Sequence, residues 1–363
     1  MYPPEGTSSE LLTVAQASAH ALRTLLDLAR TCRRPLVHLQ HNPDPDALAS
    51  GLAVQALLKR ALGVEAVMAY TGGVGRAENR AMLRWLKIQI VPAYKIDYAQ
   101  HDLVLVVDTH PGSGTCRLPA GVVPQVVIDH HPVRTQVPGV RFLMVDPSYG
   151  ATSTMVGALM LDNGVPVDER VVTALSYGID TDTQGLVRGC GPKDEAVYER
   201  VHALADKRIL GRIQRARVTQ EYFQVLENGL RHAQVTDFTV TTWVGAVAYG
   251  DAVAEIADLL FRLEGTRWVL AAGEHRGVLS FSLRALLADG VDAGAVARDI
   301  ALGQGGGHEA YAGGQVPLRP GEDPRAAFED LRERFLKAVR AKRTLTRPLT
   351  LPPVAPPEPP AGA

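Results

Sequence analysis

The sequence predicts an α/β protein with two domains: a parallel-sheet domain first, then a smaller α/β domain. Its 363 residues exceed what one small hydrophobic core usually organises. In the first half, short apolar runs alternate with helical patterns, which is typical of a sheet built from βαβ units. These runs are continuously apolar, as expected for strands that are buried on both faces of a parallel sheet.

The elements of the first half follow one another in a regular order. An amphipathic helix is expected over 9–30, because apolar residues recur there at helical spacing behind Ser8 and Ser9. The expected parallel strands are 35–40, 65–70, 102–108 and 125–129. The expected helices are 46–62, 78–86, 151–163, 168–178 and 192–205. The first domain is therefore expected over 31–206.

The second half begins with a basic stretch, 207–235, that is expected to be a helical connector. A solvated helix face explains its charge better than a groove for nucleic acid does. The second domain is expected over 236–345, where the pattern predicts strands at 239–249, 267–272 and 277–283 and helices at 252–263 and 292–302. Seven prolines among the last residues, 346–363, predict a flexible tail.

Composition excludes several classes of protein. A net charge of −1 excludes a globally basic coat for nucleic acid, so a polyanion site must be a local pocket. Cys32, Cys116 and Cys190 lie far apart, which argues against a disulfide framework and against a thiolate zinc site. The chain has no apolar run of membrane length, and its first residues lack the pattern of a secretory signal. We therefore expect a cytoplasmic protein that has no membrane partner.

Side chains that can bind metal ions follow several of the expected strands. Ligands of open α/β sheets gather at the carboxyl ends of the strands. Taken alone, an Asp at such a position is more often a helix N-cap, and a lone His is more often structural. Capping explains one Asp per junction, but it does not explain Asp-x-Asp and Asp-His-His at successive strand ends. The candidates are His41, Asp44, Asp46, Asp108, Asp129, His130, His131 and Asp182.

This mixture of carboxylates and imidazoles indicates the kind of ion. Asp and His ligands suit octahedral divalent ions such as Mn²⁺ better than they suit tetrahedral zinc, which thiolates commonly bind. About four carboxylates and two imidazoles are enough to hold two ions roughly 3.5–4 Å apart, the arrangement that serves phosphoester hydrolysis. The sequence therefore predicts a two-metal site.

Six motifs, in order, resemble the DHH phosphoesterase family, in the branch that has a DHH-associated C-terminal domain. That branch includes nano-RNases and pAp phosphatases and is related to RecJ-like exonucleases. The resemblance spans about residues 35–320, and the stretch GRAENRAM is also similar to members of the branch. The motifs are PDPDALAS, VVDTHPGSG, IDHHP, DPSYGATST, GIDTDTQG and GQGGGHEAYAGG.

The resemblance implies two divalent cations, Mn²⁺ in particular, and a role for each ligand. It implies that Asp44 and Asp46 each hold one ion and that Asp108 bridges both. His130 and Asp182 would complete the second site.

The resemblance also implies catalytic roles, and it has one departure. His131 would contact the scissile phosphate or orient the nucleophile, while Asp129 would brace a histidine. The family's first motif has a His at the position of Gln40, whereas this chain has His41 one position late. Either the turn re-aims His41 toward the ion, or Gln40 completes a weaker ligand set, since an amide oxygen binds Mn²⁺ less strongly than imidazole does. The residues leave both alternatives open.

The second domain is expected to hold the substrate. Gly305, Gly306 and Gly307 followed by His308 can form a loop whose N–H groups converge on an anion. A bare triple glycine is more often a turn. The resemblance implies that this motif and Arg284 bind a terminal phosphate or nucleotide, in a cleft between the domains.

We therefore expect a metal-dependent phosphoesterase that hydrolyses short oligonucleotides, as nano-RNases do, and/or pAp. Its partners would be short oligonucleotides or nucleotide phosphates. A homodimer is among the oligomeric states that we expect for the chain. One alternative is a cyclic-dinucleotide phosphodiesterase; another is a non-catalytic nucleotide-binding regulatory protein with a degenerate first metal site. The resemblance argues against an inorganic pyrophosphatase, because that branch of the family has a different C-terminal domain without the GGGH motif.

Overall fold

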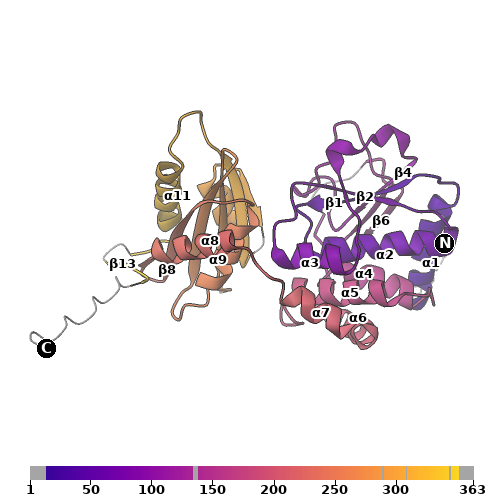
Figure 1. Cartoon of the computed structure of the whole chain (residues 1–363). Helices are drawn as coiled ribbons and strands as arrows, with labels where there is room; N and C mark the ends of the chain where they lie inside the picture. Colours follow the sequence, from indigo (N-terminus) through magenta and orange to yellow (C-terminus); the bar gives the residue numbers. More distant parts are fainter. Residues whose placement is uncertain (1–13, 134–137, 288–289, 308, 343–344, 351–363) are drawn as a thin grey trace, which may run out of the picture. The chain divides into compact units, whose positions relative to one another are not determined.

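A computed structural model describes residues 14–133, 138–287, 290–307, 309–342 and 345–350. The chain divides into two compact units, Met1–Ala216 (unit 1) and Arg217–Ala363 (unit 2). Each unit has its own sheet, and Figure 1 shows the helices that cover each sheet. The expected α/β class with two sheets is confirmed.

Unit 1 contains a six-stranded sheet in which every pair of neighbouring strands is parallel. Its strand order is β3-β2-β1-β4-β5-β6. Strands β2 and β3 are thus added on one side of β1, and β4 to β6 are added on its other side. The carboxyl ends of β1 and β4 are therefore neighbours at the switch point, where ligands of such sheets bind. The strands are β1 (Pro35–His41), β2 (Val67–Thr71), β3 (Val91–Pro92), β4 (Leu103–Val107), β5 (Val126–Asp129) and β6 (Phe142–Val145).

Helices complete unit 1. The main core cluster joins α2, α4 and α5 to one face of the sheet through residues such as Leu39, Leu52 and Leu175. The other face has a smaller cluster around Leu36 and Val104. The helices are α1 (Val14–Ala29), α2 (Pro45–Leu62), α3 (Ala77–Trp85), α4 (Thr152–Leu161), α5 (Glu169–Asp182), α6 (Pro192–Leu204) and α7 (Lys207–Gln214), with short 3₁₀ turns η1 (Ala93–Lys95) and η2 (Tyr98–Gln100).

Unit 2 contains a seven-stranded mixed sheet with the order β11-β12-β10-β9-β8-β7-β13. Helices α10 and α11 pack on one face through one core cluster, and α8 and α9 pack on the other face through a second cluster. The strands are β7 (Gln234–Thr236), β8 (Thr239–Ala246), β9 (Trp268–His275), β10 (Val278–Ala285), β11 (Gly305–Gly307), β12 (Tyr311–Pro317) and β13 (Thr346–Pro348). The helices are α8 (Gln220–Arg231), α9 (Asp251–Leu260), α10 (Ala293–Ile300) and α11 (Pro324–Ala338).

The structure differs from the expected elements in several places. In unit 2, helix α11 and strands β7 and β12 were not expected. The edge strands β3 and β6 were not expected, because they have two and four residues and carry too short an apolar pattern. The expected connector contains two helices, α7 in unit 1 and α8 in unit 2. The expected tail is corrected at its start, where β13 pairs with β7 and Leu349 N donates to Ala233 O at 2.9 Å. Residues 351–363 lie outside the described residues.

Candidate metal centre

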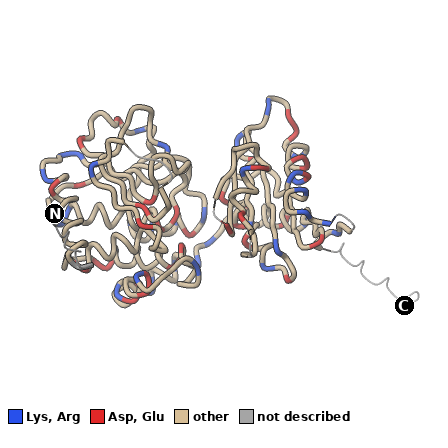
Figure 2. Tube along the Cα trace, turned by 180° about the vertical axis from the view of Figure 1, so that it is seen from behind, with Lys and Arg blue, Asp and Glu red and all other residues tan. Residues whose placement is uncertain are grey.

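Acidic side chains of unit 1 lie where strands of its sheet end and where neighbouring helices begin or end. Asp44 caps α2, and Asp46 lies in the first turn of that helix. Asp108 follows β4, Asp129 ends β5, and Asp182 ends α5. Figure 2 shows several acidic positions close together in the interior of unit 1.

Two overlapping groups of side chains could hold metal ions, and the predicted ligand Asp44, whose Oδ1 accepts from Ala47 N at 3.0 Å, belongs to neither of them. Ligand atoms of Asp46, His130 and Asp182 all lie within 4.8 Å of one another, and so do those of Asp108, His130 and His131. His130 Nε2 is 3.2 Å from Asp182 Oδ2 and 3.8 Å from Asp108 Oδ1. The other ring nitrogen, Nδ1, lies 3.2 Å from the Tyr149 carbonyl oxygen, which directs Nε2 toward the carboxylates.

The N-terminus of α4 holds Asp46. Both carboxylate oxygens accept backbone N–H groups at 2.7 Å, Oδ2 from Thr152 and Oδ1 from Ser153. A helix N-terminus stabilises a buried anion through these free N–H groups and the helix dipole. Each oxygen keeps a second lone pair, so Asp46 can still bind a cation. The motif DPSYGATST thus positions a carboxylate that lies more than one hundred residues earlier in the chain.

Asp108 is the most constrained residue of the site. It adopts a left-handed backbone conformation with φ 61°, which costs about 1–2 kcal/mol in a residue other than glycine. Its Oδ2 accepts from Gln40 Nε2 at 3.1 Å, and its Oδ1 accepts from Thr152 Oγ1 at 2.8 Å. The strain is consistent with a site that needs this carboxylate in one place.

The electrostatics of the cluster favour a cation. Burial and the carboxylates of Asp46 and Asp44 raise the pKa of Asp108 and that of Asp182 well above the usual range. Burial and Asp46 also raise the pKa of Asp44. Like charges packed this closely out of water disfavour ionisation, and a divalent cation would reverse that effect. The donor set therefore fits divalent metal ions.

Asp129 connects two histidines rather than joining the carboxylate cluster. Its Oδ2 accepts from His110 Nδ1 at 2.5 Å, and its Oδ1 accepts from His131 Nδ1 at 2.8 Å. Burial opposes ionisation, but these hydrogen bonds lower the pKa of Asp129 below its usual value. Burial alone would lower the pKa of His131, yet the hydrogen bond and the charge of Asp129 raise it. A negative Asp129 thus supports a positive His131, and in that state His131 cannot act as a ligand in the group that it forms with Asp108 and His130.

Of the polar residues in and before the first motif, Gln40 contacts the carboxylate cluster, whereas His41 and His38 contact other side chains. Gln40 is buried and reaches Asp108, as described above. His41 does not enter either metal-binding group; its Nδ1 lies 3.0 Å from Thr71 Oγ1, after a shift in the pairing of β1 with β2. His38 contacts the Tyr98 hydroxyl at 2.7 Å. The position that the resemblance gives to a histidine ligand is thus held by an amide.

In unit 2 the glycines form a strand rather than the expected loop. Gly305, Gly306 and Gly307 make up β11, which pairs antiparallel with β12. A Cβ on Gly305 would lie 2.3 Å from Ala297 O, and a Cβ on Gly307 would lie 2.5 Å from Tyr311 O. Glycine is needed here because the strand is closely packed between α10 and β12. His308 lies outside the described residues.

Arg284 is held on the face of the sheet that packs against α9. Its Nε donates to Asp258, Nη1 donates to Ser282 Oγ at 2.6 Å, and Nη2 donates to Ala254 O at 3.4 Å. Its side chain is 14% exposed. The guanidinium is therefore fixed in place, with Asp258 as its anion in this structure.

The same face carries a strip that lacks side chains. Ser282 pairs with Gly313, and Gly313 pairs with Gly306. Residues that pair directly across neighbouring strands point to the same face of a sheet. A Cβ on Gly306 would meet nothing within 4 Å. Gly313 itself is closely packed, since a Cβ on it would lie 2.6 Å from Phe281 O, and Arg284 pairs with Tyr311 on the same face. The open position on this face is therefore at Gly306, two strands away from Ser282.

Two site residues were missed in the sequence analysis. His110 stands two residues after Asp108 in VVDTHPGSG, and Thr152 lies in DPSYGATST. Both motifs were used for the resemblance, but no spacing rule indicates which of their polar residues turns inward. Only the side-chain directions, which place His110 on Asp129 and Thr152 on Asp108, show their part in the site.

Comparison with protein families supports the same division of the chain. Residues 35–179 match the DHH family, N-terminal domain, and residues 237–342 match the DHHA1 domain. An uncharacterized protein of Methanocaldococcus jannaschii is 28% identical over 325 residues, which are 85% of this chain and 63% of that protein. A manganese-dependent inorganic pyrophosphatase of Methanothrix thermoacetophila is 25% identical over 162 residues, 44% of this chain and 51% of that protein. The chain thus spans less than two thirds of the length of these curated relatives.

Solved structures resemble the whole fold. An exopolyphosphatase-related protein from Bacteroides fragilis has a TM-score of 0.69 at 14% identity, over 88% of this chain and 96% of that chain. RecJ from Thermus thermophilus, in complex with Mn²⁺, has a TM-score of 0.53 at 18% identity, over 91% of this chain and 56% of that chain. At these identities the likeness shows the fold alone. The family resemblance and the fold class expected from the sequence are confirmed. No helix among the described residues has the length and apolar character needed to span a membrane.

Proposed function

Because the chain belongs to the DHH family of phosphoesterases and carries a DHHA1 domain, we propose that it hydrolyses short oligonucleotides, or pAp, with two divalent cations bound in unit 1. One observation carries the proposal. Carboxylates and a histidine from four separate segments converge at the carboxyl ends of parallel strands, and burial raises the pKa of several of these carboxylates. Such a cluster is suited to holding metal ions near a phosphoester.

The ligands would divide between two ions. Asp44 and Asp46 would hold one ion each, Asp108 would contact both, and His130 and Asp182 would complete the second site. Mn²⁺ suits this mixture of oxygen and imidazole donors. When bound, such ions supply Lewis acidity for the phosphoryl oxygens and lower the pKa of bound water.

The remaining residues would orient the reacting groups. His131, kept positive by Asp129, would hold a proton beside the scissile phosphate and stabilise the charge that develops on its oxygens. Thr152 and the N-terminus of α4 would keep Asp108 and Asp46 in place. Preorganised donors of this kind contribute to catalysis because they need little rearrangement during the reaction.

Unit 2 would bind the far end of the substrate. Arg284 can present its planar donors to a phosphate once Asp258 is displaced. Gly306, on the same face of the sheet, would leave room for part of a nucleotide, because a Cβ there meets nothing within 4 Å. A terminal group held in this way favours short substrates over long ones.

The test is hydrolysis of a 5′-phosphorylated diribonucleotide with Mn²⁺, alongside pAp, a cyclic dinucleotide and pyrophosphate. We expect turnover of the linear dinucleotide or pAp that stops when EDTA is added. Asp108→Asn should lower kcat by at least about a thousandfold, since it weakens the ligand shared by both ions. Asp27→Asn, at an exposed surface pair with Arg30, is the control and should leave kcat unchanged.

The substrate panel separates the alternatives. Preference for the cyclic dinucleotide or for pyrophosphate would replace the proposed substrate while leaving the hydrolase class intact. Tight nucleotide binding without metal-dependent turnover of any substrate would contradict catalysis and favour a regulatory protein.

A further inference from the structure

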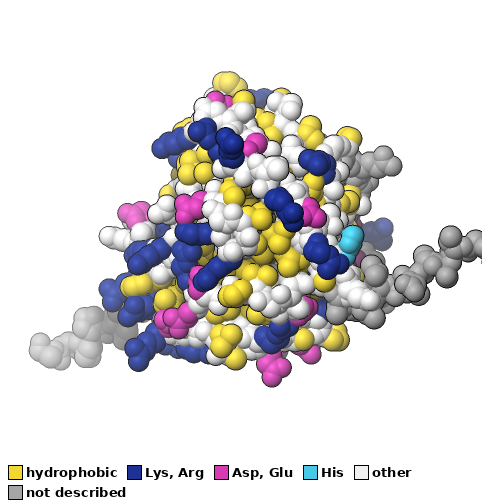
Figure 3. Space-filling view, turned by 90° about the vertical axis from the view of Figure 1, so that its right-hand side faces the viewer, with side chains coloured by type: hydrophobic (Ala, Val, Ile, Leu, Met, Phe, Trp, Pro, Cys, Tyr) yellow, Lys and Arg dark blue, Asp and Glu magenta, His cyan; other side chains and the backbone are white. Residues whose placement is uncertain are grey.

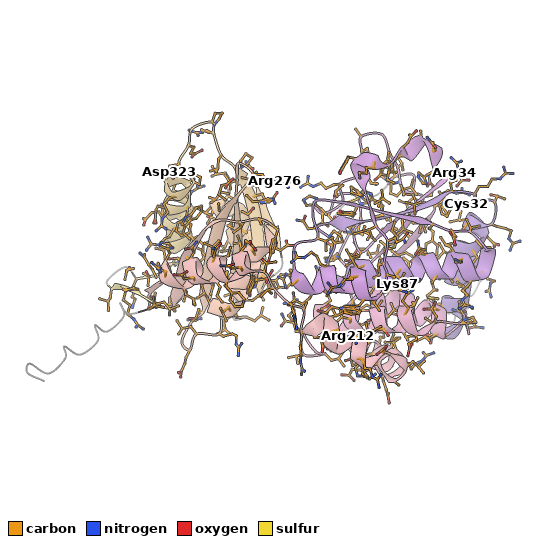
Figure 4. All side chains as sticks on the ribbon, in the orientation of Figure 1. Cys32, Arg34, Lys87, Arg212, Arg276 and Asp323 are labelled. Carbon is orange, nitrogen blue, oxygen red and sulfur yellow. The ribbon has the colours of Figure 1, made fainter. Side chains whose placement is uncertain are left out.

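Six exposed basic side chains lie on two neighbouring helices of unit 1, α3 and α7, or within two residues of their ends. We call this surface the α3–α7 face; its residues are Arg84, Lys87, Lys207, Arg208, Arg212 and Arg215. Trp85 of α3 lies against Arg212 of α7, so residues more than one hundred positions apart form one surface. Figure 4 labels Lys87 and Arg212, which come from the two parts of the face.

The charge of the α3–α7 face is not neutralised by carboxylates. Some exposed basic residues elsewhere in unit 1 form ion pairs, as Lys59 does with Glu65 and Arg200 with Asp162. Within the described part of the chain, no ion pair joins a residue of the α3–α7 face to a carboxylate. The nearby Asp206 is used as the N-cap of α7, where its Oδ1 accepts from the N–H groups of Arg208 and Ile209. The face is therefore a local positive surface on a chain of nearly zero net charge.

The basic groups are held on a rigid support. The Arg212 guanidinium lies 4.5 Å from the centre of the Trp85 ring, and that of Arg84 lies 5.3 Å from it. Leu210 and Ile213 are buried, which turns the opposite side of α7 toward solvent. Cation–π contacts and a buried apolar side limit the freedom of these arginines before any ligand binds.

The α3–α7 face begins beside the metal centre. At the start of α3, Asn79 Nδ2 donates to the carbonyl oxygen of Pro43 at 3.4 Å, and Pro43 immediately precedes Asp44. Six residues separate Asn79 from Trp85 at the end of α3, which corresponds to about 9 Å along the helix, and Lys87 follows two residues later in a left-handed conformation. A chain whose end lies at Asp44 could thus follow α3 onto the basic face.

We propose that the α3–α7 face binds the phosphate backbone of a single-stranded oligonucleotide whose end lies at the metal centre. The proposal rests on the proposed function and extends its substrate beyond a dinucleotide. Arginine and lysine spread along two helices match a row of phosphates. A membrane surface fits less well: among the described residues, none of the large apolar side chains that are exposed belongs to α3 or α7, and the nearest in sequence, Leu204 at the end of α6, is a single side chain rather than an apolar face.

Direct binding tests the proposal. A fluorescein-labelled single-stranded hexaribonucleotide is titrated with the full chain in EDTA, so that no metal-dependent hydrolysis occurs. The test variant is Lys87→Glu with Arg208→Glu, because neither residue contacts Trp85. The matched control is Arg33→Glu with Arg60→Glu, which changes the charge equally. Residue 33 precedes β1 and residue 60 lies in the last turn of α2, so both are at the end of the sheet opposite the metal centre.

Figure 3 shows the side of unit 1 on which Arg34 lies, where acidic side chains lie among the basic ones. The test variant should raise Kd about tenfold or more and make log Kd less dependent on log salt, by about 0.7 for each lost phosphate contact. The control should bind as the wild type does. With Mn²⁺, KM for the dinucleotide should stay the same in the test variant.

Several results would overturn the proposal. It fails if the wild type does not bind the hexanucleotide, if the test variant binds as well as the wild type, or if the control loses as much affinity. Stronger binding to phosphatidylserine vesicles than to the oligonucleotide would assign the face to a membrane instead. A wild type that binds the hexanucleotide through this face but hydrolyses no oligonucleotide would contradict the proposed function and leave the face assigned.

Discussion

Gln40 is the residue at which this chain departs from the motif it resembles. Its amide lies 3.1 Å from Asp108, whereas His41 contacts Thr71. Gln40→His should therefore raise Mn²⁺ affinity about tenfold, since an imidazole nitrogen is a better ligand than an amide. Isothermal titration calorimetry of the metal-free protein measures this change.

His41→Ala is the matched control for that prediction. It removes an imidazole of the same motif from outside the metal-binding groups and should leave Mn²⁺ affinity within about twofold. Loss of affinity in His41→Ala, together with no gain in Gln40→His, would show that His41 is the ligand.

His110 supports Asp129 from the side opposite His131. His110→Leu leaves a buried carboxylate with one donor fewer, so Asp129 should hold His131 less well and kcat should fall about tenfold or more. His110→Asn keeps an N–H donor at a similar position and should retain most of the activity. Steady-state kinetics on the dinucleotide measures both; equal losses in the two variants would argue against a positioning role and for a packing defect.

At the scale of elements, the metal centre depends on the contact of α5 with α2 and α4. A Cβ on Gly178 of α5 would lie 2.5 Å from Ser153 Oγ and 3.0 Å from Ala49 Cβ. Gly178→Ala should therefore lower the free energy of unfolding by about 1–3 kcal/mol. It should also weaken Mn²⁺ binding, because Ser153 N holds Asp46. Denaturant unfolding and calorimetry measure the two effects.

Gly211 of α7 provides the matched control. A Cβ there would meet nothing within 4 Å, and the residue lies inside a helix. Gly211→Ala should leave Mn²⁺ binding unchanged and stabilise the protein by up to about 1 kcal/mol through helix propensity. Equal destabilisation by both substitutions would indicate a cause other than the close contact at Gly178.

At the scale of the whole molecule, the cluster links stability to pH and to metal. The pKa values of Asp44, Asp108 and Asp182 are raised in the folded state, mainly by burial and then by neighbouring carboxylates. A raised carboxylate pKa means that the folded state binds protons more tightly than the unfolded chain does. The metal-free protein should therefore lose stability as pH rises from about 4 through the raised pKa values.

Thermal unfolding in EDTA and in excess Mn²⁺ measures this linkage. In EDTA, Tm should fall more between about pH 5 and about pH 8 in the wild type than in Asp108→Asn, because protonation removes the repulsion within the cluster. His38 and His41, whose pKa values burial lowers, act in the opposite direction but alike in both proteins. Mn²⁺ should raise Tm most at the higher pH, and binding should release protons. A wild type whose Tm changes with pH as that of Asp108→Asn does would contradict the assignment of the buried cluster.

Local patterns explain why much of the fold could be predicted. The continuously apolar runs at 35–40 and 102–108 and the helical spacing of 46–62 became β1, β4 and α2. These signals are strong because burial on both faces, or on one helical stripe, constrains every position. The short edge strands β3 and β6, and β13 in the assumed tail, carry no such pattern; they form because a neighbouring strand offers free backbone groups.

The amino-acid sequence by itself determined the alternation of strands and helices along the first half of the chain and placed acidic and histidine residues at their ends. From these residues and the motifs around them came the expectation of a metal-dependent phosphoesterase. Only the tertiary structure decided that Gln40 faces the carboxylates and His41 does not, that His110 supports Asp129, and that the triple glycine is a packed strand. The reason is physical: periodicity and capping act between neighbours in the chain. The direction of a side chain after a register shift, and the contacts between segments far apart, depend on how the whole unit packs.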